Sequence, residues 1–145
     1  MKNKLRYLLL AVLILGGIFA SGCNLTGGSA VTSKYTQDAS NAVAEDWVKH
    51  NSPTFVFDGS NLQFMQSTSL RCQYTWMYEF RFNSANSGYG NRKGKAPNGQ
   101  KTNHIIQVVV QKNKIIAAVA DDQYDELNNK PGETIVVDQI ERSCL

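Results

Sequence analysis

The sequence predicts an α+β fold in which one N-terminal helix packs on an antiparallel sheet of about five to six strands. Three observations lead to this prediction. Apolar residues recur at helical spacing over residues 38–50, they alternate with polar residues from residue 55 onward, and the alternating segments are joined mostly by short turns rich in Gly, Asn and Pro. A single helix of this length is marginal in water, so we expect it to cover the apolar face of the sheet.

The helix is predicted between two sequence signals. Asp38 is a candidate N-cap, and the segment Asn51-Ser52-Pro53 ends the helical pattern. One stripe of the predicted helix is formed by Ala39, Ala42, Val43 and Trp47.

The first strands are predicted to be short. Phe55 and Phe57 precede an Asp58-Gly59 turn, and Leu62 and Phe64 follow it, which is typical of a hairpin between two short strands.

The later strands are longer. Residues 71–82 predict a strand with one buried and one solvent-exposed face. The predicted buried face carries Cys72, Tyr74, Trp76, Tyr78, Phe80 and Phe82. Residues 104–111 and 115–120 predict a hairpin, and residues 133–142 predict a last strand that brings Cys144 to the sheet.

The N-terminal segment has the pattern of a secretory signal. It begins with three cations and continues with an apolar run from Leu8 to Ala20, which at 1.5 Å per residue is roughly 20 Å long and shorter than a bilayer core of roughly 30 Å. Ala20-Ser21-Gly22-Cys23 resembles the lipobox of prokaryotic lipoprotein precursors, although that family usually has Leu at the position of Ala20. The resemblance implies cleavage before Cys23 and a lipid anchor on its sulfur.

These signals predict three parts of the chain. Residues 1–22 are a signal peptide, residues 23–36 are a flexible tether rich in Gly, Ser and Thr, and residues 37–145 are a single domain. An ordinary cleaved signal and an uncleaved anchor are the alternatives. The predicted location is extracytoplasmic, on the cell membrane or the outer membrane.

The charge of the chain argues against a nucleic-acid partner. The formal net charge of +3 comes from Lys2, Lys4 and Arg6, and residues 23–145 carry twelve basic and twelve acidic side chains. With Cys23 assigned to the lipid, Cys72 and Cys144 form an even pair, for which a disulfide is the expected state in an oxidising compartment.

A 21-residue connection, residues 83–103, is unusually long for a domain with short loops. The segment from Arg81 to Lys114 contains seven cations and no acid, so it is either a basic arm for an anionic partner or a solvated connection. Its GxGxxxG spacing differs from the dinucleotide fingerprint. The predicted binding residues are Tyr89, Arg92, Lys93, Lys95 and His104.

The alternatives to a binding module are a small hydrolase and a protease inhibitor. His104 with Glu79 could form an acid–base pair, although no spacing brings the two together. The helix-on-sheet plan resembles the cystatin family, and Gln107–Gln111 is similar to its inhibitory loop but lacks the terminal Gly. Residues 121–126 are acidic without the calcium-loop pattern, so we predict no cofactor, metal or assigned catalytic residue.

A second resemblance concerns residues 74–127. The order GYGNRxG followed by a strand pair and DDQYDEL resembles uncharacterised small secreted or lipid-anchored bacterial proteins with a GYGxRxG motif. Asn103 and Asp122 depart from that pattern, which has Pro and Gly there. The resemblance directs attention to Tyr89, Arg92, His104 and Asp121. The resulting prediction is an envelope lipoprotein that binds an anionic polymer or a protein through a basic Gly-rich loop.

Overall fold

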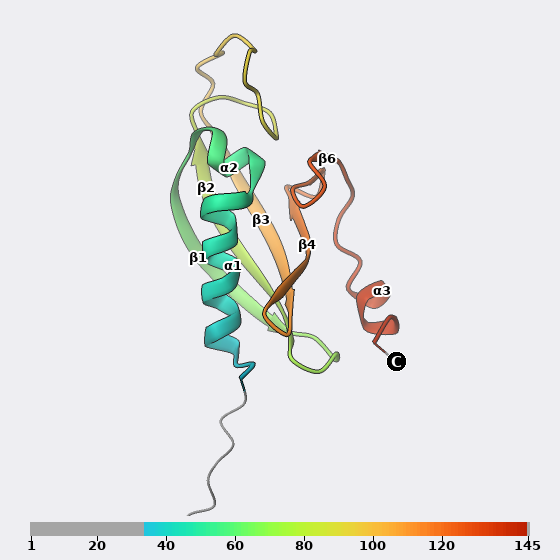
Figure 1. The fold of residues 1–145 in the computed structure, drawn as a ribbon. Coiled ribbons are helices and arrows are strands. Elements are labelled where there is room, and N and C mark those ends of the chain that lie inside the picture. Colours follow the sequence, from blue (N-terminus) through green and yellow to red (C-terminus); the bar gives the residue numbers. More distant parts are fainter. Residues whose placement is uncertain (1–33, 145) are drawn as a thin grey trace, which may run out of the picture. The chain divides into compact units, whose positions relative to one another are not determined.

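The computed structural model describes residues 34–144, so the predicted signal peptide, Cys23 and most of the predicted tether lie outside the described residues. Helix α1 spans Gln37–Asn51 (Figure 1). Its N-cap is Thr36, whose hydroxyl accepts a hydrogen bond from the Ala39 N–H at 3.1 Å. The cap therefore lies two residues before the predicted Asp38, which is in the first turn.

Residues 53–58 form helix α2 (Pro53–Asp58), so the predicted strand containing Phe55 and Phe57 is wrong. Ser52 caps this helix by accepting a hydrogen bond from the Phe55 N–H, and Pro53 occupies the first turn, where no backbone donor is needed. The Ser52 cap and Pro53 favour a helix here, and they prevail over the two-residue alternation of Phe55 and Phe57, which favours a strand.

The sheet is a six-stranded antiparallel meander in which each strand pairs with its neighbours in the sequence. The fold is thus the predicted α+β arrangement of a helix on an antiparallel sheet. The strands are β1 (Gly59–Ser69), β2 (Thr75–Ser84), β3 (Thr102–Gln111), β4 (Lys114–Ala120), β5 (Tyr124–Asp125) and β6 (Lys130–Pro131).

The core lies between α1 and one face of the sheet, where Figure 1 shows the helix crossing β2 and β3. The fully buried side chains of this cluster are Ala44, Val48, Tyr78, Phe80, Phe82, Ile106, Val108, Val110 and Ala118. The helix stripe is rotated from the predicted one, because Ser40, Ala44 and Val48 are buried while Ala42 is exposed. Ser40 is accommodated because its hydroxyl donates to the Asn113 side chain at 3.0 Å.

Two of the predicted strands are corrected. The long strand starts at Thr75 and not at residue 71, because the chain must reverse after Ser69, and Tyr74 adopts a positive φ of 55° in that turn. The predicted last strand over residues 133–142 is wrong, since Val137–Arg142 is helix α3. Val136, Val137 and Ile140 have helical spacing.

The C-terminal segment is joined to the turn between β1 and β2. Cys72 and Cys144 form a disulfide with their Cα atoms 5.6 Å apart, and the Arg71 N–H donates to Glu141 Oε1 at 2.9 Å. No residue of α3 is buried, and further contacts of this segment run from Cys72 Sγ to the Ile140 carbonyl and from Arg71 to the Glu141 carboxylate. Among residues 34–144, no helix has both the length and the apolar character needed to cross a bilayer.

Candidate functional site

The Gly-rich loop, residues 85–101, connects β2 to β3 at the end of the domain opposite to the first turn of α1 (Figure 1). Two asparagine side chains organise it. Asn86 Oδ1 accepts from the Asn98 and Gly99 N–H groups, each at 3.0 Å, and Asn98 Oδ1 accepts from the Ser87 N–H at 3.2 Å. The loop therefore has a defined path, although the sequence predicts no regular structure for it.

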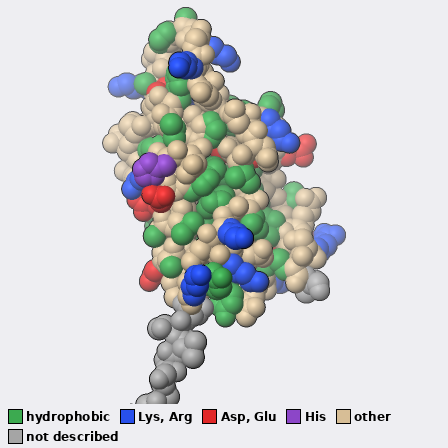
Figure 2. Space-filling view, viewed as in Figure 1, with side chains coloured by type: hydrophobic (Ala, Val, Ile, Leu, Met, Phe, Trp, Pro, Cys, Tyr) green, Lys and Arg blue, Asp and Glu red, His purple; other side chains and the backbone are tan. Residues whose placement is uncertain are grey.

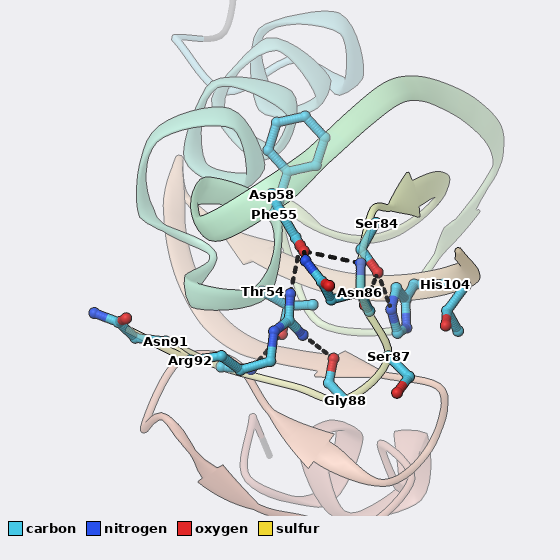
Figure 3. A network of polar contacts seen from close by, with 12 residues as sticks. Thr54, Phe55, Asp58, Ser84, Asn86, Ser87, Gly88, Asn91, Arg92 and His104 are labelled. Carbon is cyan, nitrogen blue, oxygen red and sulfur yellow. Dashed lines mark hydrogen bonds and ion pairs between the residues drawn. The ribbon is translucent and has the colours of Figure 1, made fainter. Parts of the chain in front are cut away.

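Arg92 holds this loop against α2 (Figure 3). Its guanidinium forms an ion pair with Asp58 and donates to the Gly88 carbonyl. It also lies 4.8 Å from the centre of the Phe57 ring. Only 6% of Arg92 is exposed. The charge of Arg92 is thus already paired inside the domain, and a contact between Arg92 and a ligand stays a prediction.

Asp58 links α2 to the loop by further bonds. Its second carboxylate oxygen accepts from the Asn86 N–H at 3.0 Å and from the Asn86 side-chain amide at 2.9 Å. Arg92 and Asn86 are six residues apart, so one carboxylate fixes both ends of the Gly88 turn. The loop backbone is thereby held by groups that compensate the charge of Asp58.

His104 and Tyr89 meet at a second carboxylate, that of Asp121. His104 Nδ1 lies 2.6 Å from Asp121 Oδ2, and the Tyr89 hydroxyl donates to the same oxygen at 3.1 Å. The Tyr89 ring also packs against the His104 ring, with the ring centres 5.3 Å apart, and stacks on the Tyr124 ring, with the centres 5.4 Å apart. Three of the four residues singled out by the GYGxRxG resemblance, Tyr89, His104 and Asp121, thus form one contact network, whereas Arg92 belongs to the Asp58 network.

Ser84, His104 and Asp121 have the connectivity of a Ser–His–carboxylate hydrolase site. Ser84 Oγ lies 3.0 Å from His104 Nε2 and, on its other side, donates to the Asn86 carbonyl at 2.7 Å. The Ser84 hydroxyl thus lies between the Asn86 carbonyl and the His104 ring. Ser84 and His104 are each 1% exposed. The geometry is that of a structural bridge between β2 and β3, without an accessible nucleophile.

The predicted acid–base pair of His104 and Glu79 does not form. Glu79 lies on the opposite face of β2 from Tyr78 and Phe80, where its carboxylate contacts Gln66 Nε2 at 3.4 Å. His104 pairs in register with Phe82 and packs on that ring in the core face. The two side chains are therefore on different sides of the sheet.

The environment of Asp121 and Tyr89 changes both pKa values. Burial raises the pKa of Asp121. The hydrogen bonds from His104 and the Ile105 N–H, together with the charge of His104, lower it by more, so the net shift of this pKa is downward. Burial and the adjacent Asp121 charge raise the pKa of Tyr89 to about 12. The neutral phenol is therefore favoured in the folded domain.

We expect this tyrosine to make the domain sensitive to alkali. A group whose pKa is raised on folding stabilises the fold below its unfolded pKa, near 10, and this contribution is lost as the pH rises to 12. At about 1.4 kcal/mol per pKa unit, discounted for the partial exposure of the ring, the loss amounts to about 2 kcal/mol for Tyr89. Urea unfolding across this pH range, with tyrosinate absorbance recorded in parallel, should give a smaller loss in Tyr89→Phe, and an identical loss in both proteins would refute the assignment.

Glu126 is the residue of this region that the sequence did not reveal. It is 1% exposed and accepts hydrogen bonds from the Ser52 hydroxyl at 2.8 Å, the Thr54 N–H at 3.0 Å and the Thr54 hydroxyl. Thr54 in turn accepts from the Gly90 N–H at 2.7 Å. The first N–H groups of a helix have no partner within the helix, so the start of α2 requires an acceptor from elsewhere in the chain. This requirement is the sequence signal that could have indicated a buried carboxylate here.

Gly90 is required where the Gly-rich loop crosses this network. Its φ is +70°, and a Cβ there would meet the Tyr124 hydroxyl and come within 2.9 Å of Asn129 Oδ1. The glycine thus allows the backbone to approach Thr54 closely.

A groove of about 510 Å³ lies between α2, the end of α1 and the Gly-rich loop. Its apolar part includes Val56 and Phe57, which are 55% and 37% exposed, and its rim includes His50, Asn91 and Lys93. Lys93 and Lys95 are exposed, in contrast to Tyr89, Arg92 and His104. Figure 2 shows Lys and Arg side chains projecting at the loop end of the domain.

No group of three His, Cys, Asp or Glu side chains within residues 34–144 is arranged to hold a metal ion. No protein family, curated protein or solved structure matches this chain.

Proposed function

We propose that this chain is a lipid-anchored, extracytoplasmic binding module whose loop end engages an anionic envelope polymer. The anchor rests on the lipobox-like segment that ends at Cys23. The binding end rests on the groove beside α2 and on the exposed lysines of the Gly-rich loop.

The single observation that carries the binding proposal is the bracing of the loop. Arg92 and Asp58 use their charges internally, and they fix the backbone from which Asn91 and Lys93 project at the groove. A loop held in one conformation loses less entropy when a partner binds. The lysines then supply charge, and Val56 and Phe57 supply apolar contact.

The tether would join the domain at the end opposite to the Gly-rich loop, which fits a partner that lies away from the anchoring membrane. The first turn of α1 and the Gly-rich loop lie at opposite ends of the described domain (Figure 1). A tether that enters at Thr36 therefore joins the end remote from Lys93 and Lys95. This arrangement favours a polymer over the lipid head groups of the same bilayer as the partner.

The binding proposal is tested with Lys93→Ser/Lys95→Ser in the full chain. Each exposed charge contact contributes up to about 1 kcal/mol, so the double variant should bind an anionic polymer such as teichoic acid or lipopolysaccharide about tenfold more weakly. The measurement is a titration at about 0.01 M salt, where the Debye length is about 30 Å.

A matched control has the same change in charge at the other end of the domain. Lys112→Ser/Lys114→Ser alters the turn between β3 and β4, which contacts the start of α1 through Asn113. The proposal requires this variant to bind like the wild type. Equal weakening in both variants would indicate nonspecific attraction and would contradict the proposal.

The anchor is tested separately by fractionation of cells that produce the wild type and Cys23→Ser. We expect the wild type in the membrane fraction, with a mass increased by lipid on Cys23, and the variant released from the membrane. A mature wild-type chain that begins at Cys23 without lipid would refute the anchor and leave the binding result unaffected.

A further inference from the structure

A second pocket lies on the face of the sheet that α1 does not cover. It has a volume of about 260 Å³ and is lined only by polar side chains, namely Asn61, Gln63, Arg81, Asn83 and Asn103. They come from the first half of β1, the end of β2 and the start of β3. The pocket is separate from the groove beside α2, with which it shares no residue.

The strand register accounts for this convergence. Arg81 pairs with Gln63 across β1 and β2, and Asn83 pairs with Asn103 across β2 and β3, so these side chains project on the same face. Asn61 joins them at an irregularity of β1, where its φ is +55° and the register shifts.

The side chains of this cluster are exposed, except for the half-buried Asn83, and few of their polar groups have a partner within residues 34–144. Arg81 Nη2 donates to Gln63 Oε1 at 3.0 Å. The side-chain amides of Asn61, Asn83 and Asn103 have no hydrogen-bond partner among residues 34–144. Each of these amides offers an acceptor oxygen and two N–H donors to a ligand, and a guanidinium offers five donors.

We propose that this amide pocket binds a sugar unit that carries a carboxylate. Adjacent sugar hydroxyls both donate and accept hydrogen bonds, which matches amides that present both kinds of group. Arg81 is the only charged side chain in the lining, so an anionic substituent is favoured, and a guanidinium can hold a carboxylate with two parallel bonds. The volume lies just below the usual range for small-molecule sites, which limits the contact to one or two sugar units.

The test compares two matched pairs of sugars with the full chain in detergent micelles. Glucuronic acid is paired with glucose, and N-acetylmuramic acid with N-acetylglucosamine, and binding is followed by NMR shifts of backbone and side-chain amides. At least one acidic sugar should shift the signals of Asn83 and Asn103, and should bind about tenfold more tightly than its neutral partner.

Variants separate the carboxylate contact from the sugar contact. Arg81→Gln should reduce the affinity for the acidic sugar to that for its neutral partner, while Asn103→Val should weaken both. Lys114→Gln removes the same charge outside the pocket and should leave binding unchanged.

Three outcomes would overturn the proposal. These are the absence of saturable shifts with either acidic sugar, shifts that map to the groove beside α2, or an affinity for acetate equal to that for the acidic sugar. Because Lys93 and Lys95 lie outside this pocket, their variants do not affect this test, and failure here is distinguishable from failure of the loop proposal.

Discussion

Replacing Arg92 by Met should destabilise the domain by about 3 kcal/mol, because it leaves the carboxylate of Asp58 without its charged partner. The Asp58 side chain is 12% exposed, so water cannot fully replace the guanidinium. The expected readout is a lower urea midpoint in equilibrium unfolding of the full chain.

Two further variants isolate the ion pair. Lys93→Met makes the same kind of change at the next, exposed position and should alter the free energy of unfolding by less than about 0.5 kcal/mol. Adding Asp58→Asn to Arg92→Met should recover part of the loss, since the buried charge is then absent. A loss below about 1 kcal/mol in Arg92→Met would contradict an internal role for this residue.

Replacing Glu126 by Ala should have an effect of similar size, about 3 kcal/mol. The substitution removes the acceptor of three hydrogen bonds and leaves the Ser52 hydroxyl, the Thr54 hydroxyl and the Thr54 N–H buried without partners. Glu126→Gln keeps the shape and one carbonyl oxygen, so it should lose less.

The measurement for Glu126 combines unfolding with hydrogen exchange. Because Thr54 also accepts from the Gly90 N–H, we expect faster exchange of that amide in Glu126→Ala than in the wild type. Glu133→Ala, at an exposed position, is the matched control. Unchanged stability in Glu126→Ala would show that water replaces the carboxylate and that α2 needs no buried acceptor.

The regular strands could be predicted from the sequence because their information is local. The two-residue alternation through Tyr78, Phe80 and Phe82 marks a strand with one buried face, and the structure has β2 there. The hairpin of β3 and β4 follows equally from two apolar segments and a short turn, in which Lys112 and Asn113 adopt positive φ. Such patterns need no knowledge of distant residues.

The short helices could not be predicted in this way. Helices α2 and α3 have six residues each, which is less than two turns, so a helical period is hardly visible in them. Phe55 and Phe57 imitate a strand, although the Ser52 cap and Pro53 favour a helix start. Local capping decides the structure here, and the hydrophobic pattern points the other way.

The roles of the loop residues depended on partners far away in the sequence. Arg92 looked like a ligand-binding cation because the acid that neutralises it, Asp58, lies 34 residues earlier and in a different element. The sequence offers Glu79, on the exposed face of the long strand, as a partner for His104, whereas the fold brings Asp121 to His104 from the end of β4. Lys93 and Lys95 remain exposed, and their binding role stays a prediction.

We infer that internal contacts hold the Gly-rich loop rigid and so present its lysines at the groove. Backbone ¹⁵N relaxation of residues 86–95 in the wild-type chain tests it most directly. We predict order parameters near those of β3, about 0.85, whereas values below about 0.6 would describe a mobile loop and contradict the claim.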